Sequence, residues 1–110
     1  MRILPVCSLF ICLLVDANVR ADDAVEEHLA LKNHAFLPRE LTVPAGQKIK
    51  LILTNQDPTP AEFESEELHR EKTITANGTI TFFIGPLDAG TYPYFDDFHH
   101  DTTTGTIVAQ

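Results

Sequence analysis

The chain has 110 residues, enough for one small domain, and a formal net charge of −8 at pH 7. An acidic domain repels nucleic acid and anionic lipid, so cations or a basic face of another protein are its natural partners. The sequence has no glycine-rich phosphate loop and no Gly-x-Ser-x-Gly motif, which argues against nucleotide and serine-hydrolase chemistry.

The N-terminus has the order of a secretory signal peptide. Arg2 precedes an apolar run from Ile3 to Val15, and a segment that suits signal cleavage ends at Ala21. The apolar run is shorter than the ~20 residues that a helix needs to cross a bilayer. We therefore expect a signal peptide at residues 1–21, a periplasmic domain at residues 22–110 and no membrane insertion after cleavage.

Both cysteines, Cys7 and Cys12, lie in the predicted signal peptide. The exported domain must then fold with neither a disulfide nor a thiolate-bound metal, and its core must come from packing alone. Residues 22–27 are acidic and poor in large apolar side chains, so we expect the folded part to begin near His28.

Short runs that are typical of β-strands follow one another along the rest of the chain. The clearest extends from Gln47 to Asn55, where lysines alternate with isoleucine and leucine. Asn77-Gly78 predicts a tight hairpin turn between two such runs, and the segment from Glu64 to Arg70 suits one helical turn. The predicted strands are 29–33, 41–43, 47–55, 71–75, 79–84, 91–95 and 105–109. About seven short strands and almost no helix predict an all-β sandwich.

The segment between the last two predicted strands concentrates possible metal ligands. Asp96, Asp97 and Asp101 contribute carboxylates, and His99 and His100 contribute imidazoles. Carboxylate oxygen and neutral imidazole nitrogen together suit iron, copper or zinc, and Asp96 can converge with His99 if the loop turns. The alternative is a solvated loop that binds no metal.

A second cluster of carboxylates follows a proline-rich turn. In an extended segment Glu62 and Glu64 point to one side, while Phe63 points to the other. This geometry anchors the ring in the core and aims two carboxylates at the same place. Their repulsion is relieved by a metal ion or by protonation.

Other acidic and histidine residues have simpler interpretations. The glutamates can form an exposed acidic face that Arg70 and Lys72 balance, and this interpretation is favoured for Glu66 and Glu67. His34 lies at a strand end, where a core or hydrogen-bonding role is commoner than metal ligation.

Several motifs occur in a fixed order along the predicted domain. They are Phe36-x-Pro38, Leu41-Thr42-Val43-Pro44-Ala45-Gly46, Gly90-Thr91-Tyr92-x-Tyr94 and Gly105-x-Ile107. Their order resembles the cupredoxin superfamily over nearly all of the predicted mature chain, which implies a cupredoxin-like Greek-key β-sandwich. The segments Asn55–Ser65, Arg70-Glu71-Lys72 and Phe98-His99 resemble most closely the small periplasmic cupredoxin-like proteins associated with bacterial ferrous-iron permeases.

The sequence departs from the blue-copper members of that superfamily at their metal ligands. Those proteins place a cysteine after the Gly-x-Tyr strand, followed by a histidine and a methionine, and here the three positions hold Asp96, His99 and Thr103. Their upstream histidine is also missing, because its neighbourhood is Ala61-Glu62. Hard oxygen thus replaces soft sulfur, so we expect no blue type 1 copper site.

The resemblance implies a site for a copper or iron ion, built from Glu62, Asp96 and His99 with Glu64 as a further ligand. It also implies a part in ferrous-iron oxidation and uptake, with a membrane iron permease and other periplasmic components of an iron uptake system as partners. Such a protein would be an iron-oxidising oxidoreductase. The alternatives are a non-catalytic periplasmic carrier of iron or copper and a metal-free interaction module.

Overall fold

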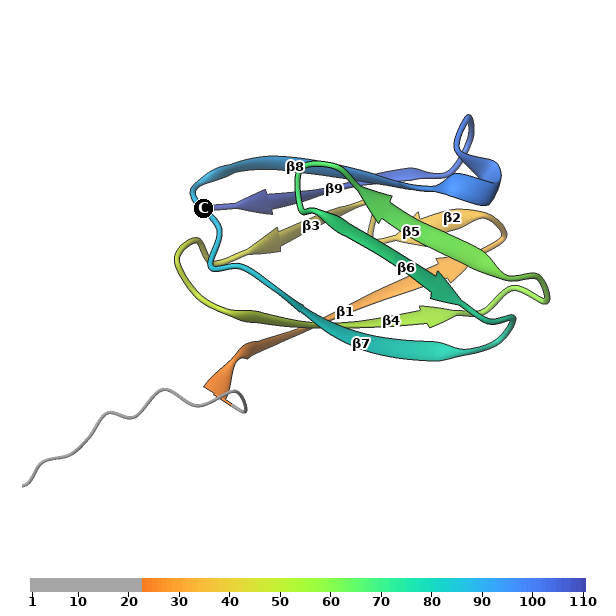
Figure 1. The fold of residues 1–110 in the computed structure, drawn as a ribbon, viewed down its shortest axis with the longest axis horizontal. Coiled ribbons are helices and arrows are strands. Elements are labelled where there is room, and N and C mark those ends of the chain that lie inside the picture. The colour runs from red at the N-terminus through yellow and green to blue at the C-terminus, as the bar shows by residue number, and fades with distance from the viewer. Residues whose placement is uncertain (1–22) are drawn as a thin grey trace, which may run out of the picture.

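The computed structural model describes residues 23–110, so the predicted signal peptide lies outside the described residues. These residues form nine β-strands and the short 3₁₀ helix η2 (Figure 1). The elements are β1 (Val25–Lys32), β2 (Ala35–Leu37), β3 (Glu40–Val43), β4 (Ile49–Asn55), β5 (Ala61–Ser65), β6 (Arg70–Ile74), β7 (Thr79–Ile84), β8 (Gly90–Asp96), η2 (Asp97–His99) and β9 (Thr104–Ala109). In this part of the chain no helix has the length and apolar content that crossing a bilayer requires.

The strands form two sheets that pack face to face (Figure 1). One sheet has the order β2-β1-β4-β7, and the other has the order β3-β9-β8-β5-β6. β1 pairs with β4 and β3 pairs with β9 in parallel, whereas the remaining pairs are antiparallel. The chain crosses repeatedly between the two sheets, so several neighbours within a sheet are not consecutive in the sequence. The predicted all-β sandwich is confirmed, and the strands beyond the expected seven are β2 and β5.

Alternating apolar side chains from both sheets form the core. Along β4, Ile49, Leu51 and Leu53 are fully buried, whereas the residues between them are half-buried. Between the sheets the ring of Phe63 stacks on that of Tyr94, with 4.7 Å between their centroids. Burying a side chain of this size contributes about 1.5–3 kcal/mol relative to leaving it exposed. Packing of this kind holds the described residues together without any cysteine.

The turn at Asn77-Gly78 is not the predicted hairpin. It joins β6 to β7, which are edge strands of different sheets, so the turn carries the chain from one sheet to the other. Asn77 has a positive φ of 56°, which asparagine tolerates well, and its backbone N–H donates to the carbonyl of Asp57 at 3.0 Å. The dipeptide correctly marks a turn, but it says nothing about which strands pair.

Two predicted element boundaries are also wrong. β1 begins at Val25, which pairs with Ile49 of β4, so the sheet starts before His28. The expected helical turn between Glu64 and Arg70 is instead the end of β5, a short turn and the start of β6. β5 and β6 pair as far as Ser65 and Arg70, so only residues 66–69 remain for the turn.

Candidate metal centre

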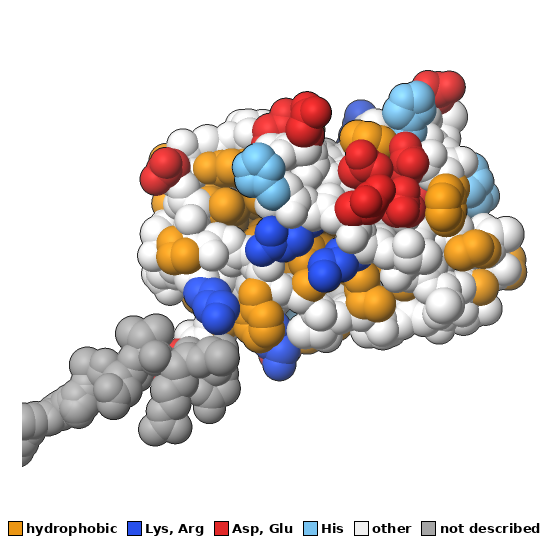
Figure 2. Space-filling model, viewed as in Figure 1, with side chains coloured by type: hydrophobic (Ala, Val, Ile, Leu, Met, Phe, Trp, Pro, Cys, Tyr) orange, Lys and Arg blue, Asp and Glu red, His pale blue; other side chains and the backbone are white. Residues whose placement is uncertain are grey.

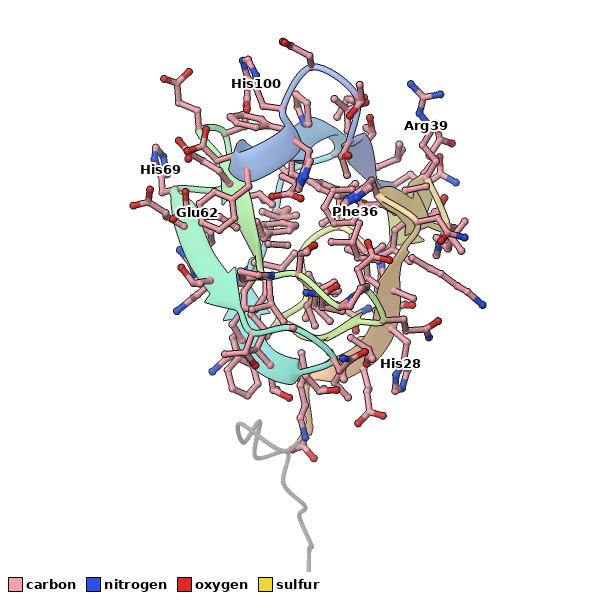
Figure 3. All side chains as sticks on the ribbon, turned by 90° about the vertical axis from the view of Figure 1, so that its right-hand side faces the viewer. His28, Phe36, Arg39, Glu62, His69 and His100 are labelled. Atoms are coloured by element: carbon pink, nitrogen blue, oxygen red, sulfur yellow. The ribbon has the colours of Figure 1, made fainter. Side chains whose placement is uncertain are left out.

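One end of the sandwich brings together the segments that carry the predicted ligands. The turn between β1 and β2, the segment between β4 and β5, and η2 all lie at the right-hand end of Figure 1. Figure 3 views this end, with Glu62 on the β5 side and Phe36 on the β2 side.

Asp96 ends β8 with its carboxylate inside the protein, where the residue has 0% exposure. Its Oδ1 accepts hydrogen bonds from the backbone N–H of Glu62 at 2.9 Å and of Phe98 at 3.1 Å, and the second bond caps η2. Its Oδ2 lies 3.1 Å from Nδ1 of His99. Both carboxylate oxygens are therefore engaged within the protein, and Asp96 fixes β5, η2 and the His99 ring relative to one another.

Glu62, Glu64 and Asp97 form what we call the acidic triad, because one carboxylate oxygen from each lies within 4.8 Å of the others. Strand alternation points both glutamates outward, while Phe63 between them is fully buried. β5 and β8 pair so that Phe63 lies opposite Asp96, and this register puts Asp97 on the same outer face as the glutamates. Figure 2 shows acidic side chains gathered in a compact patch on this face of the molecule.

Glu62 and Glu64 hold their protons more tightly than isolated carboxylates do, because their pKa values are raised. The pKa of Glu62 is raised, first by partial burial and then by a side-chain hydrogen bond with Asp97 and by the charge of Glu71. Partial burial also comes first in raising the pKa of Glu64, followed by the charges of Asp97 and Glu71, and His100 opposes the shift. Glu71 lies directly opposite Glu64 on β6. The arrangement therefore favours a proton or a bound cation among the carboxylates.

Basic side chains of the described residues do not neutralise the acidic triad by ion pairing. Arg70 donates from Nε and Nη2 to the carbonyl of Phe83, at 3.2 and 2.9 Å. Lys72 places its Nζ 5.8 Å from the ring centroid of Phe82. The two residues that sequence reasoning offered as counter-charges are thus directed toward β7.

His34 and His99 form a second group beside Asp96, which we call the histidine pair. Their ring centroids are 4.1 Å apart and the rings are tilted by 36°. His34 lies in the turn between β1 and β2, and Thr103 ties that turn to the segment after η2 by donating from Oγ1 to the His34 carbonyl at 2.7 Å. The His34 and His99 side chains are 46% and 35% exposed, so both rings reach solvent.

The four predicted ligands fall into two neighbouring places. Glu62 and Glu64 belong to the acidic triad on the outer face. Asp96 is buried and contacts His99, which is one ring of the histidine pair. Sequence reasoning did not select Asp97, although Asp97 supplies the third carboxylate of the triad. The role of each residue as a ligand stays a prediction.

The chain matches the family model of the cupredoxin-like domain over residues 5–109, and it therefore belongs to this family. An uncharacterized protein of Rickettsia prowazekii (strain Madrid E) is 38% identical over 112 residues, which cover 96% of this chain and 90% of that protein.

Solved structures with the same fold include two copper proteins. Auracyanin A, a blue copper protein of the green thermophilic photosynthetic bacterium Chloroflexus aurantiacus, gives a TM-score of 0.66 at 17% identity, covering 78% of this chain and 98% of auracyanin. The metal-binding domain of the Cu(I)-exporting P-type ATPase of Streptococcus pneumoniae D39, solved with Cu(I), gives 0.65 at 12% identity, covering 77% of this chain and 84% of that domain. Amicyanin of Paracoccus versutus gives 0.60 at 22% identity, covering 84% and 86% of the two chains. At these identities the likeness shows the fold.

Residues 23–110 do not fit a copper–thiolate centre of the blue type. Such a centre is held by a cysteine thiolate, two histidines and a weak axial ligand that is often methionine. Residues 23–110 contain neither cysteine nor methionine, and β8 ends in Asp96. The donors that the described residues do offer are the carboxylate oxygens of the acidic triad and the imidazole nitrogens of the histidine pair.

Proposed function

We propose that this chain is an exported, periplasmic metal-binding protein that binds copper or iron without a thiolate and takes part in ferrous-iron oxidation and uptake beside a membrane iron permease. The observation that carries the proposal is the acidic triad. Glu62, Glu64 and Asp97 bring three carboxylates within 4.8 Å, and no lysine or arginine among residues 23–110 pairs with them.

The chemistry of the acidic triad suits iron better than it suits a soft ion. Carboxylate oxygens are hard ligands, and they stabilise Fe(III) relative to Fe(II). An Fe(II) substrate held there loses an electron more readily than it does in water. With Cu(II) as the acceptor, one electron leaves Fe(II), so that the products are Fe(III) and Cu(I).

Export and partnership rest on the sequence. The predicted signal peptide at residues 1–21 directs the protein to the periplasm, and the resemblance to proteins associated with ferrous-iron permeases supplies the partner. The acidic patch in Figure 2 offers a surface from which a cation can pass to such a permease without an apolar contact.

A carrier that does no redox chemistry is the second candidate. It is favoured by the side chains of residues 23–110, which include no thiol and no thioether that would mediate rapid electron transfer. The two functions separate in one assay. An oxidase converts Fe(II) to Fe(III) while it consumes Cu(II), whereas a carrier returns iron in the oxidation state in which it was bound.

The site is tested by anaerobic calorimetry of Fe(II) with the full chain carrying Cys7→Ser and Cys12→Ser, which removes all thiols. Glu62→Gln/Glu64→Gln should weaken Fe(II) binding by roughly tenfold or more, because loss of even a supporting residue costs about 10–100-fold at metal sites. Glu66→Gln/Glu67→Gln is the matched control, since it removes the same charge from exposed neighbours.

Equal losses in the two double variants would show that iron responds only to overall charge, and the acidic triad would then not be the site. No binding of Fe(II) or Cu(II) to any version of the protein would leave the metal-free interaction module. Where binding is lost only from Glu62→Gln/Glu64→Gln, the oxidation assay with Cu(II) decides between oxidase and carrier.

A further inference from the structure

The turn between β1 and β2 holds His34 at a position where glycine is usually found. The turn consists of Asn33 and His34, because Lys32 and Ala35 are paired across it. Both residues have positive φ angles, 52° and 59°, which defines a type I′ hairpin turn. Glycine is strongly preferred at the second position of such a turn, and a side chain there is strained. Histidine enters this backbone region more often than most residues do, yet glycine remains the residue that the turn prefers.

The His34 ring is directed at the ring of His99, from a segment that lies far away in the sequence. The 4.1 Å between the centroids is van der Waals contact. Neutral imidazole is the form in which a histidine binds a metal ion.

A buried carboxylate stands behind each ring. His99 places Nδ1 3.1 Å from Oδ2 of Asp96, whose side chain is 1% exposed. His34 places Nδ1 3.7 Å from Oδ2 of Asp57, whose side chain is 7% exposed. Asp57 is itself fixed, because it accepts the backbone N–H groups of Asn33 and His34 at 2.6 and 2.9 Å.

A carboxylate at one nitrogen of an imidazole is the usual support of a metal-binding histidine. It fixes the ring and keeps the proton on that nitrogen, so that the other nitrogen carries the lone pair. In this part of the chain Nε2 of neither His34 nor His99 has a hydrogen-bond partner. A metal ion with two imidazole ligands at about 2.0–2.1 Å holds their nitrogens within about 4 Å of each other. The 4.1 Å between the ring centroids puts the two rings in contact, and both side chains reach solvent, so either ring can turn to bring its Nε2 to a shared ion.

We propose that His34 and His99 bind one borderline transition-metal ion through their Nε2 atoms, while Asp96 orients the His99 ring and Asp57 holds the turn that carries His34. Imidazole nitrogen suits copper and zinc, and Cu(II) binds such a site more tightly than Zn(II) does. Water completes the coordination, because both rings reach solvent. This site is separate from the acidic triad and does not rest on it.

The test uses Zn(II) as a diamagnetic probe and the full chain carrying Cys7→Ser and Cys12→Ser. Long-range ¹H–¹⁵N NMR spectra resolve both nitrogens of each histidine ring. Before Zn(II) is added, His99 should show the tautomer with the proton on Nδ1, which faces Asp96. During the titration the Nε2 resonances of His34 and His99 should shift together at one equivalent, whereas those of the exposed His69 and His100 should stay in place.

Variants at His34 make the test specific. His34→Gly suits the turn better than histidine does, so the variant folds, and it should weaken Zn(II) binding by roughly tenfold or more. His100→Gln removes a neighbouring exposed imidazole and should leave the affinity unchanged. Retention of affinity in His34→Gly, or a shift of His100 Nε2 as large as that of His99, would overturn the proposal.

The outcome is independent of the proposed iron site. Glu62→Gln/Glu64→Gln should leave the histidine shifts intact even though it weakens Fe(II) binding. Loss of the histidine response in that variant would mean that the two groups form a single site, which contradicts the separate site proposed here.

Discussion

The acidic triad and the histidine pair lie on either side of Asp96, and the protein builds them in opposite ways. The carboxylates of the triad are placed together by strand register without any ion pair from a lysine or arginine of the described residues. Each ring of the histidine pair instead has a buried carboxylate at its Nδ1. The triad therefore gains from any cation, whereas the pair is prepared for an ion that binds nitrogen.

The donors that residues 23–110 offer at this end of the sandwich differ from the ligands of a blue copper protein. A blue copper centre is held by a cysteine thiolate, two histidines and a weak axial ligand. Asp96 stands at the end of β8 with 0% exposure and uses its oxygens for the backbone of β5 and η2 and for the ring of His99. The oxygens of Asp96 thus support the residues around it, and the role of Asp96 as a metal ligand stays a prediction.

The largest expected effect comes from removing this support. Asp96→Ala leaves the partly buried backbone N–H groups of Glu62 and Phe98 without their acceptor, and an unsatisfied buried donor costs about 1–3 kcal/mol. We expect a loss of about 3 kcal/mol in the free energy of unfolding, measured in urea. Asp97→Ala, one residue along on the exposed side, should cause no loss. Equal stabilities of the two variants would show that Asp96 supports neither group.

The sandwich could be predicted from the sequence because its signals are local. In β4 the lysines alternate with buried Ile49, Leu51 and Leu53, and such alternation identifies a strand whatever it pairs with. Pairing itself is not local. Asn77-Gly78 marks a turn correctly, yet the strands that it joins belong to different sheets, which only the packing of the whole domain decides.

The candidate site was predictable where its signals are local, and it was not predictable where it depends on strand pairing. Alternation along β5 gave the outward direction of Glu62 and Glu64, but the choice between Asp96 and Asp97 as their neighbour depends on the register of β5 against β8. A slip of one residue exchanges the two aspartates between the inside and the outside. His34 carried a signal that sequence reasoning passed over, since Asn33-His34 occupies a two-residue turn where Asn-Gly is expected.

A second, smaller change in the free energy of unfolding should be a gain, and it distinguishes a metal-binding histidine pair from a contact that only stabilises the fold. His34→Gly relieves a positive φ that costs a non-glycine residue about 1 kcal/mol, so thermal and urea unfolding should show a gain of about that size. Asn33→Gly is the matched control and should gain less, because asparagine tolerates this backbone region. A net loss in His34→Gly would mean that the ring contact with His99 stabilises the fold, and a metal would then not be needed to explain His34.

The smallest effect concerns the charge of the acidic triad. Because the pKa of Glu64 is raised in the folded protein, the native state binds the proton more tightly than the unfolded chain does. The charged form therefore lowers stability above the raised pKa, and this cost disappears as the pH falls through it. Glu64→Gln should then unfold at a higher temperature than the wild type at pH 7 without metal, and the two midpoints should converge as the pH is lowered. Glu66→Gln removes the same charge from an exposed position nearby and should show a smaller difference at every pH. If the two variants behave alike, the carboxylates of the triad repel one another no more than ordinary surface charges do, and the contrast with the histidine pair fails.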